Sequence, residues 1–504
     1  MPRNLFSIRN SSPGHQIVAA LKAGGFPSLP VQVVTGKQTL KCIKSRGFIR
    51  RRRLSARMRR ANYLQDIMVP HLTTALTGPL HDLERRFLSA MPTIEHWLRT
   101  QWLEHAVPFY ASVDLRNSGF KLAPVDTNLF PGGFNNLNPD FLPLCVLAMQ
   151  SAVEKICPEA RGVLLIPENH TRNQFYLQNV AQIVLILKQA GMRVRIGSLL
   201  PEITAATQIQ LPNGGALTLE PLVRRANRLG LDDPGAGSGT GFDPCVILLN
   251  NDLSAGVPDI LKDLEQAVFP PLSVGWYARR KSQHFAAYDR VAGEFAELLG
   301  IDPWLINPYF ATCDRVDFRE RVGEECLAAQ VDAVLQKIRV KYAEYGVKHD
   351  PFVIVKADAG TYGMGIMTVK DASEITGLNR KQRNKMAVVK EGLAVSDVLI
   401  QEGVYTFEQI NEAVAEPVIY MIDHYVVGGF YRVHTTRGVD ENLNAPGMHF
   451  MPLAFETHCT LPNPDCGPDD TPNRFYAYGV VARLALLAAS LETEDREQRA
   501  EDIR

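Results

Sequence analysis

The chain has 504 residues, of which 46% are hydrophobic and 21% are charged, and its formal net charge is zero. These values are typical of a soluble globular enzyme, and the length predicts two or three domains with an ample core. No apolar run approaches the roughly 18 residues of a membrane-spanning helix, which argues against such a helix.

The charge is unevenly distributed, because residues 1–67 contain 14 Lys and Arg but only one acidic residue, Asp66. Such a leader fits a basic arm for nucleic acid, an arginine-rich transit peptide, or a segment read from a start codon assigned too far upstream. We favour the third interpretation, since the composition turns globular at Met68, and we expect residues 1–67 to be disordered. Mass spectrometry of the native N-terminus would distinguish the three.

Apolar side chains at helical spacing predict helix within residues 72–105, and residues 109–115 predict a strand. Residues 114–136 are dense in glycine and polar side chains, which rarely serve a core. This segment therefore predicts a binding site for a small charged substrate. Its candidate residues are Arg116 and Lys121 for a carboxylate, Asp126 for an ammonium group, and Asn128 and Asn135 for neutral hydrogen bonds.

Helices and strands then alternate, as in an α/β layer with a partly parallel sheet. The predicted helices and strands are helices 141–156 and 174–190, strands 162–166, 193–197 and 245–250, and a further helix near 257–267. Ligands gather at the carboxyl ends of strands in such layers, so Arg172 is a further candidate for substrate binding. Residues 276–284 fit an anion site or, slightly better, a solvated helix face.

A helix predicted at residues 319–345 precedes the most informative segment, residues 351–370. A short apolar strand ends on Lys356, a glycine-rich loop follows, and residues 366–369 predict a return strand. One cation beside unobstructed backbone N–H groups suits a polyphosphate. The lysine precedes the loop, unlike the lysine of a P-loop, and the plainer alternative is a glycine-rich hairpin with a surface lysine.

This segment resembles the nucleotide-binding hairpin of the ATP-grasp superfamily. The resemblance implies that Lys356 contacts the α- and β-phosphates of ATP and that the loop closes over the γ-phosphate. The loop residues that it assigns to ATP are Gly360, Thr361, Gly363 and Gly365. It further implies that residues 398–404 form the hinge beside adenine and ribose, with contacts from Gln401, Glu402 and Val404.

Residues 417–421 and 425–435 predict a β-hairpin with its turn near Asp423 and His424. Arg432 lies among the alternating apolar residues of its second strand. An arginine in this position can clamp a transferring phosphoryl group. The alternative is a surface arginine on an amphipathic strand.

Residues 440–447 are rich in the hard oxygen ligands that Mg²⁺ prefers. Glu441 and Asn444 are the preferred ligands, with Asn442 and Asp440 as further candidates. ATP-grasp enzymes usually have a glutamate and an asparagine two apart, whereas Glu441 and Asn444 are three apart. A polar loop without metal is the alternative.

The sequences of these segments resemble those of one family, the proteobacterial glutamate–cysteine ligases of the ATP-grasp-like type. The matching runs are DLRNSGFKLAPVDTNLFPGGFNNL, VKADAGTYGMG, IQEGV, EPVIYMID, VVGGFYRVH and NLNAPG. The resemblance extends over residues 68–487. It implies ATP- and Mg²⁺-dependent joining of the γ-carboxylate of glutamate to the amine of cysteine through γ-glutamyl phosphate, the first step of glutathione synthesis, with Lys356 and Arg432 as catalytic residues.

The eight cysteines show neither a CxxC pair nor metal-ligand spacing. Several lie in apolar runs, such as Cys145 and Cys245, and are expected to be buried free thiols. Free thiols indicate a reducing cytoplasm. Nothing in the sequence supports catalysis by a thiol nucleophile.

The sequence therefore predicts an α/β and α+β protein: an α/β substrate domain at residues 68–318, an ATP-grasp-like domain of two α+β subdomains at 319–487, and a charged, frayed tail at 488–504. The predicted ligands are ATP, Mg²⁺, glutamate and cysteine, with no nucleic acid or membrane partner. Two alternatives remain: a related carboxylate–amine ligase such as a glutathione synthetase-like enzyme, and a non-catalytic nucleotide-sensing or nucleic-acid-binding protein.

Overall fold

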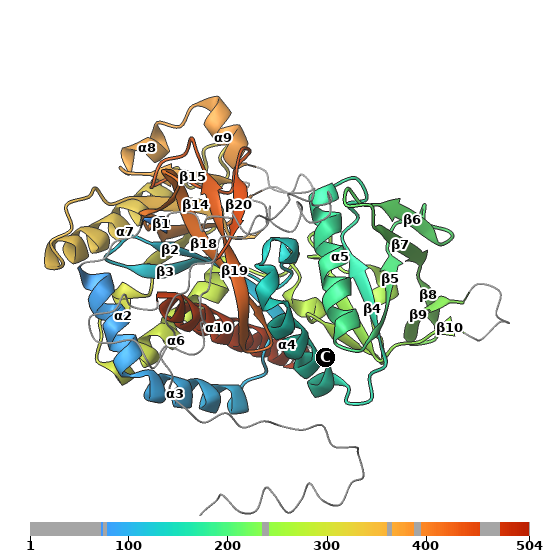
Figure 1. The fold of residues 1–504 in the computed structure, drawn as a ribbon. Helices are drawn as coiled ribbons and strands as arrows, with labels where there is room; N and C mark the ends of the chain where they lie inside the picture. Colours follow the sequence, from blue (N-terminus) through green and yellow to red (C-terminus); the bar gives the residue numbers. More distant parts are fainter. Residues whose placement is uncertain are drawn as a thin grey trace, which may run out of the picture. The chain divides into compact units, whose positions relative to one another are not determined.

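The computed structural model describes residues 72–73, 78–233, 241–359, 365–387, 395–453 and 474–502. The predicted leader 1–67 and the loop residues Gly360, Thr361 and Gly363 lie outside these ranges. Residues Met68–Arg504 form one unit by backbone proximity. Within the described ranges, four β-sheets and the helices around them form this unit (Figure 1), so the mixed α/β and α+β class is confirmed.

A six-stranded sheet forms the α/β layer predicted for the first half of the chain. Its strands, in spatial order, are β12 (Ala267–Phe269), β11 (Val246–Asn250), β4 (Gly162–Pro167), β5 (Arg193–Ser198), β7 (Ala216–Pro221) and β6 (Thr207–Gln210). All are parallel except β6, which pairs antiparallel with β7 at the edge. The strand β4 is buried along its whole length, as its continuous apolar run requires. Helices α4 (Leu142–Ile156) and α5 (Gln174–Gln189) share its core.

The helix expected near residues 257–267 is wrong. The chain forms a single 3₁₀ turn, η4 (Asp259–Leu261), and then the strand β12. Pro258 precedes the turn, and Pro270 follows the strand, so the apolar run between them is too short for a stable helix. Val268 instead pairs with Ile247 at the edge of the parallel sheet.

The central seven-stranded sheet joins the two halves of the chain. Its path is β1 (Leu72–Thr73), β17 (Glu408–Ile410), β18 (Ala413–Ile422), β19 (Tyr425–His434) and β20 (His449–Pro452), with β2 (Tyr110–Asn117) beside β18 and β3 (Leu122–Asn128) beside β2. The hairpin β18–β19 turns at Asp423 and His424, as predicted. Because β2 pairs with β18, strands from both sides of the predicted border at 318/319 share one sheet.

The predicted nucleotide hairpin lies in a four-stranded antiparallel sheet. Its order is β13 (Phe310–Cys313), β16 (Val398–Glu402), β14 (Val353–Ala357) and β15 (Ile366–Val369). Helix α7 (Glu324–Glu344) packs on this sheet and against the short helix α8 (Ser373–Thr376). A second short helix, α9 (Arg380–Met386), follows α8 (Figure 1). The strands β8 (Val223–Arg225), β9 (Arg228–Asp232) and β10 (Gly241–Phe242) form a separate small sheet, and Phe242 lies against Gly162 of β4.

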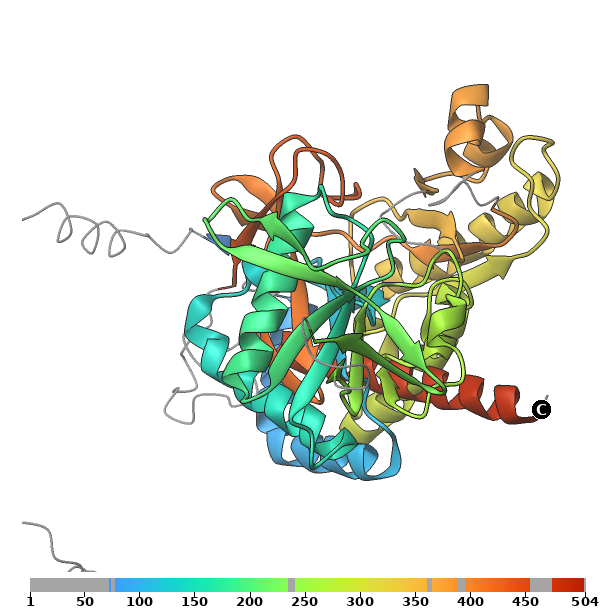
Figure 2. The same cartoon turned by 90° about the vertical axis from the view of Figure 1, so that its right-hand side faces the viewer.

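The last helix, α10 (Arg474–Asp502), corrects the prediction of a frayed tail after Leu487. It packs against α6 (Lys281–Leu299) and against β2 and β3, and Glu492 is buried there. Only the last turns project from the protein, as Figure 2 shows. By length and composition the helix could cross a membrane, but 89% of its most apolar window is buried, which is typical of a core helix.

The first predicted helical region, residues 72–105, consists of two helices, α2 (Pro79–Ser89) and α3 (Met91–Glu104). Each has a proline in its first turn, where a missing N–H costs nothing. The cysteine prediction needs one correction, because Cys157 and Cys245 form a disulfide between the end of α4 and the start of β11. Cys145 is a buried free thiol, as predicted.

Candidate active site

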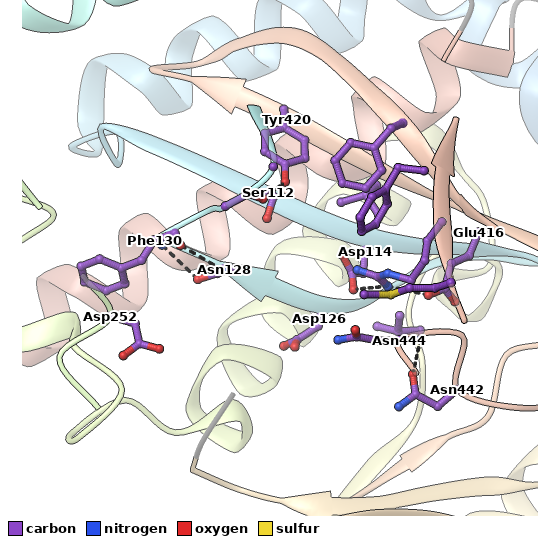
Figure 3. Close-up of a pocket in the computed structure, with 18 of the residues that line it drawn as sticks. Ser112, Asp114, Asp126, Asn128, Phe130, Asp252, Glu416, Tyr420, Asn442 and Asn444 are labelled. Atoms are coloured by element: carbon purple, nitrogen blue, oxygen red, sulfur yellow. Dashed lines mark hydrogen bonds and ion pairs between the residues drawn. The ribbon is translucent and has the colours of Figure 1, made fainter. Parts of the chain in front are cut away.

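A cavity of about 420 Å³ lies where the central sheet, the four-stranded sheet and the carboxyl ends of β4 and β11 meet (Figure 3). It brings together most of the residues that the sequence predicted. Those in its wall are Arg116, Asp126, Asn128, Asn135, Lys356, Gln401, Glu402, Val404, Arg432, Asn442 and Asn444. Five described candidates are not in the wall: Lys121, Arg172, Gly365, Asp440, which pairs with Lys370 at 2.6 Å, and Glu441.

Lys356 lies on β14 between Ile366 of the return strand and Leu399 of β16. Its Nζ donates to the carbonyl oxygen of Val125 and to Oε1 of Gln401, both at 2.8 Å. Burial lowers the pKa of Lys356 to about 7, although Asp126 nearby opposes the shift. The Nε2 of Gln401 is buried and has no hydrogen-bond partner within the described ranges.

Asp126 and Asn128 come from β3 and are two residues apart, so their side chains share one face of the strand. Asp126 pairs with Lys281 Nζ at 2.7 and 2.9 Å. Burial alone would raise the pKa of Asp126, but Lys281 and Lys356 hold it well below its usual range. Asp114 of β2 lies directly opposite Asp126 in the ladder, a like-charge placement that weakens a sheet.

Arg432 is held between two carboxylates. Its Nη1 donates to Asp114 at 2.8 Å and to Glu416 at 2.5 Å, and Glu416 also accepts from Nε of Arg116 at 2.9 Å. Burial alone would lower the pKa of Arg432, but Asp114 and Glu416 raise it above its usual range. Its Nε has no partner among the described residues. The sequence prediction missed Asp114 and Glu416, whose only signal was a charged residue within an apolar strand.

Arg116 is in the wall, but its guanidinium is already committed. Besides Glu416, it donates to the carbonyl oxygens of Val404 at 3.2 Å and Glu441 at 2.5 Å. A buried arginine with these partners fixes the wall and has little capacity left for a substrate carboxylate.

Lys121 and Glu402 form a buried ion pair behind the wall, at 2.8 Å, with side chains 0% and 1% exposed. The Glu402 carboxylate also accepts from Trp304 Nε1 at 3.0 Å and from the Tyr309 N–H at 2.9 Å. Burial lowers the pKa of Lys121 to about 8, although the charge of Glu402 raises it in part. This geometry argues against Lys121 as a substrate ligand and against the Glu402 carboxylate as a ribose ligand.

Glu441, the preferred metal ligand, faces away from the cavity. Its carboxylate accepts from the N–H of Gly438 and from Arg437, both at 2.7 Å, and these bonds lower its pKa. Asn442 and Asn444 of the same loop do line the cavity. No cluster of three His, Cys, Asp or Glu in the described ranges has metal-binding geometry. Arg172 is exposed outside the cavity.

A second arm of the cavity extends to the carboxyl ends of two parallel strands. Glu168 follows β4 and Asp252 follows β11, and Asp252 N–H donates to Glu168 at 2.8 Å. Asn179 and Asn250 also line this arm and are hydrogen-bonded to one another at 3.0 Å. The signal for Glu168 and Asp252 was their place shortly after predicted strands; for the segment 167–172 the sequence prediction used this signal and named Arg172 as its candidate. Asn179 lies within α5 and had no such signal.

Two solved structures are compared with this chain. A structure from Methylobacillus flagellatus that carries the provisional name gamma-glutamylcysteine synthetase is 69% identical, with a TM-score of 0.78, and the match covers 85% of this chain and 99% of that one. A D-alanyl-alanine synthetase A from Vibrio cholerae matches at 10% identity and a TM-score of 0.29, over 64% of this chain and 80% of that one, which is too weak to carry an argument.

No curated protein sequence matches the chain. The profile of the family described as GshA, glutamate–cysteine ligase, matches residues 84–493, which is most of the chain. The chain therefore belongs to the glutamate–cysteine ligase family.

Proposed function

We propose that this protein is an ATP-dependent ligase that joins the γ-carboxylate of glutamate to the amine of cysteine through γ-glutamyl phosphate. The observation that carries the proposal is one cavity whose wall contains Lys356 and Arg432 at one end and the acidic arm of Glu168 and Asp252 at the other. The first end suits a polyphosphate, and the second suits an ammonium group.

At the first end, the phosphates of ATP would take the place that carbonyl and amide oxygens now occupy around Lys356. Arg432 is already fixed between Asp114 and Glu416, so it can stabilise charge on the transferred phosphoryl group with little reorganisation. Lys356 would exchange its present acceptors for phosphate oxygens. The buried Nε2 of Gln401 and Nε of Arg432 support this assignment, because each belongs to a wall side chain and finds no acceptor in the part of the chain that the structure describes.

The donor set of the wall fits Mg²⁺. Carboxylates of Asp114, Asp126 and Glu416 and the amide oxygens of Asn128 and Asn442 are hard ligands of the kind that Mg²⁺ shares with nucleotide phosphates. Asp126 and Asn128 have the two-residue spacing that Glu441 and Asn444 lack, so we assign them the leading role. Bound there, the ion would neutralise phosphate charge and hold the phosphates in line for transfer.

The acidic arm would hold glutamate. The α-ammonium of glutamate does not react and stays charged, so the carboxylates of Glu168 and Asp252 can bind it throughout. Cysteine does not suit this arm, because its amine must be neutral and free to attack the acyl phosphate. Glutamate would then point its γ-carboxylate toward the phosphates at the other end of the cavity.

The proposed reaction has two steps, phosphoryl transfer and then amide formation. A γ-carboxylate oxygen of glutamate attacks the γ-phosphorus of ATP, the bond to ADP breaks, and γ-glutamyl phosphate forms. The cysteine amine then attacks the acyl carbon and phosphate leaves, while the amine proton passes to solvent or to a carboxylate. Exclusion of water from the loaded cavity would protect the intermediate from hydrolysis. We also propose that the enzyme works in the cytoplasm; the free thiols of Cys145, Cys313 and Cys326 support this, and the Cys157–Cys245 disulfide does not.

The test is ADP release from purified protein with a panel of acids and amines. We expect turnover with glutamate and cysteine together and little with either alone, and mass spectrometry should detect γ-glutamylcysteine. Turnover with a different pair, such as γ-glutamylcysteine and glycine, would replace this proposal with the glutathione synthetase-like alternative.

A further inference from the structure

The strand β3 carries Asp126 and Asn128 into the cavity, yet it is weakly supported by its own sheet. Among the described strands it pairs with β2 alone. The ladder between them is interrupted, since Asp114 pairs with Asp126 but Leu115 pairs with Pro124, which leaves Val125 without a partner. A bulge of this kind re-aims side chains and is common beside active sites. The position of Asp126 and Asn128 must therefore be fixed by other contacts.

Lys281 binds the Asp126 carboxylate itself, and two further side chains hold the main chain of the strand through its carbonyl oxygens. Lys356 Nζ donates to Val125 at 2.8 Å, and Arg279 Nη1 donates to Thr127 at 2.6 Å. Val125 and Thr127 flank Asp126, so the two bonds hold the strand on either side of that carboxylate. Lys356 is also the residue proposed to bind phosphate, and a nucleotide would compete for its bond to Val125. Arg279 has no proposed contact with the nucleotide, so its bond to Thr127 would persist when the nucleotide binds.

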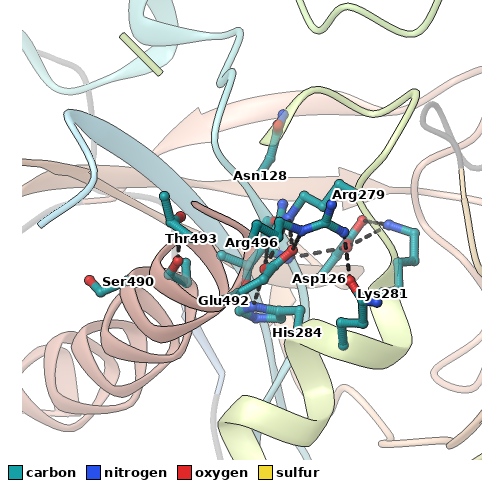
Figure 4. A network of polar contacts seen from close by, with 12 residues as sticks. Asp126, Asn128, Arg279, Lys281, His284, Ser490, Glu492, Thr493 and Arg496 are labelled. Atoms are coloured by element: carbon teal, nitrogen blue, oxygen red, sulfur yellow. Dashed lines mark hydrogen bonds and ion pairs between the residues drawn. The ribbon is translucent and has the colours of Figure 1, made fainter. Parts of the chain in front are cut away.

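Arg279 is itself fixed by the C-terminal helix (Figure 4). Its Nε and Nη2 donate to the two carboxylate oxygens of Glu492 at 3.0 Å each, and both side chains are almost fully buried. Burial alone would raise the pKa of Glu492, but Arg279 and His284 lower it to about 2, so the carboxylate is charged at neutral pH. A bidentate pair fixes both the position and the plane of the guanidinium.

We propose that Glu492 and Arg279 are positioning residues of the enzyme: Glu492 orients Arg279, and Arg279 holds Thr127 so that Asp126 and Asn128 lie correctly in the cavity. The inference rests on the proposed role of Asp126 and Asn128 toward the metal–nucleotide complex. It gives a function to the end of α10, which the sequence predicted to be a frayed tail. It also gives one to residues 276–284, for which the sequence favoured a solvated helix face.

The test compares two variants with a matched control. Glu492→Gln removes the charge that orients Arg279. Arg279→Lys keeps a cation beside Glu492 but cannot reproduce the planar fork that reaches Glu492 and Thr127 together. The control is Glu95→Gln, which breaks the bidentate pair between Glu95 and Arg483 of the same helix. Glu95 is more exposed (24%) and has no contact with β3 among its described bonds.

We expect each test variant to lower kcat by about tenfold or more, as a small misplacement of a reacting group does, and to raise the Mg²⁺ concentration that gives half-maximal activity. Glu95→Gln should lower thermal stability at most and leave both kinetic values near wild type. If the folded test variants behave like Glu95→Gln, the proposal is wrong. Where Glu492→Gln does not fold, Arg279→Lys decides.

A second measurement separates this inference from the proposed function. Calorimetric titration with Mg·ADP, without amino acids, needs no ligase activity. About tenfold weaker binding in Arg279→Lys than in Glu95→Gln supports positioning even if no acid–amine pair is turned over. Equal binding and equal kcat in these two variants would refute positioning while leaving a ligase activity of the wild type intact.

Discussion

Lys356 is buried with a pKa lowered to about 7, so in the ligand-free protein at pH 8 most molecules carry it neutral. Phosphate oxygens favour the charged form, and nucleotide binding must therefore raise this pKa. We predict proton uptake when Mg·ADP binds at pH 8 and little uptake at pH 5.5, where Lys356 is already charged. Calorimetry in two buffers of different ionisation enthalpy measures the uptake, and Lys356→Met should abolish it. Equal uptake in that variant would contradict the assignment.

The same residue should matter more for turnover than for folding. Lys356→Ala removes one preorganised donor from the phosphates, so we predict a loss of roughly 2–4 kcal/mol of transition-state stabilisation. The ratio of kcat/KM values for wild type and variant measures it. Normal turnover would place the nucleotide elsewhere.

Lys121 and Glu402 illustrate what a sequence motif leaves open. Both lie in segments that the sequence identified as functional, yet their charges satisfy one another behind the cavity wall. Glu402→Gln leaves a buried cation without its counter-charge, so we predict that about 3–5 kcal/mol of unfolding free energy is lost. Denaturant unfolding measures it. A large rise in the KM for ATP without loss of stability would instead restore the ribose-binding role.

The residue types of the site were readable from the sequence, but their partners were not. Lys356, Arg432, Asp126 and Asn128 stand out because polar residues interrupt apolar strands or gather in glycine-rich segments. Which carboxylate meets which cation depends on pairings between residues about 300 positions apart, such as Arg116 with Glu416. Local pattern carries no information about such pairs.

At the scale of elements, the hairpin of β14 and β15 agrees with its prediction because both strands and their connection are local. The turn after β16, which the sequence predicted to lie beside adenine, is also local, and Gly403 explains its shape. A Cβ at Gly403 would collide with the ring of Phe352, whose carbonyl oxygen accepts the Gly403 N–H at 2.8 Å. The glycine therefore lets the hinge lie against a buried aromatic ring that packs on Tyr405.

This close approach gives a prediction for the element. Gly403→Ala should destabilise the protein by about 1–3 kcal/mol through overpacking. Phe352→Leu in the same chain should relieve part of this loss, so the double variant should be less destabilised than the sum of the two single variants. Thermal unfolding of the four proteins completes the cycle. Strictly additive losses would show that Phe352 is not the obstacle.

Elements whose burial depends on distant partners were harder to predict. The strand β12 and the later half of α10 both carry short or charged sequences that suggest loops or tails. β12 is a strand because β11 offers an edge, and α10 stays helical past Leu487 because α6 and Arg279 cover Glu492. In both cases tertiary contact overrides a weak local pattern.

At the scale of the whole molecule, α10 contacts elements that lie far apart in the sequence. It packs against α2 and α6, against β2 and β3 of the central sheet, and its residues 480–489 are buried almost without exception. The helix thus closes the core beside the strands that carry Asp114 and Asp126. Its removal should affect folding and the active site together.

Two truncations test this last point. A chain that ends at Leu487 keeps the most apolar turns but lacks Glu492, so Arg279 is buried without its carboxylate, at a cost of about 3–5 kcal/mol. Since domains are stable by only about 5–15 kcal/mol, we predict a much lower melting temperature and loss of activity. A chain that ends at Arg499 keeps every described ion pair of Glu492 and should match the full chain. Equal melting temperatures for the two truncated proteins would show that the end of α10 is dispensable and that the network around Glu492 does not hold the fold.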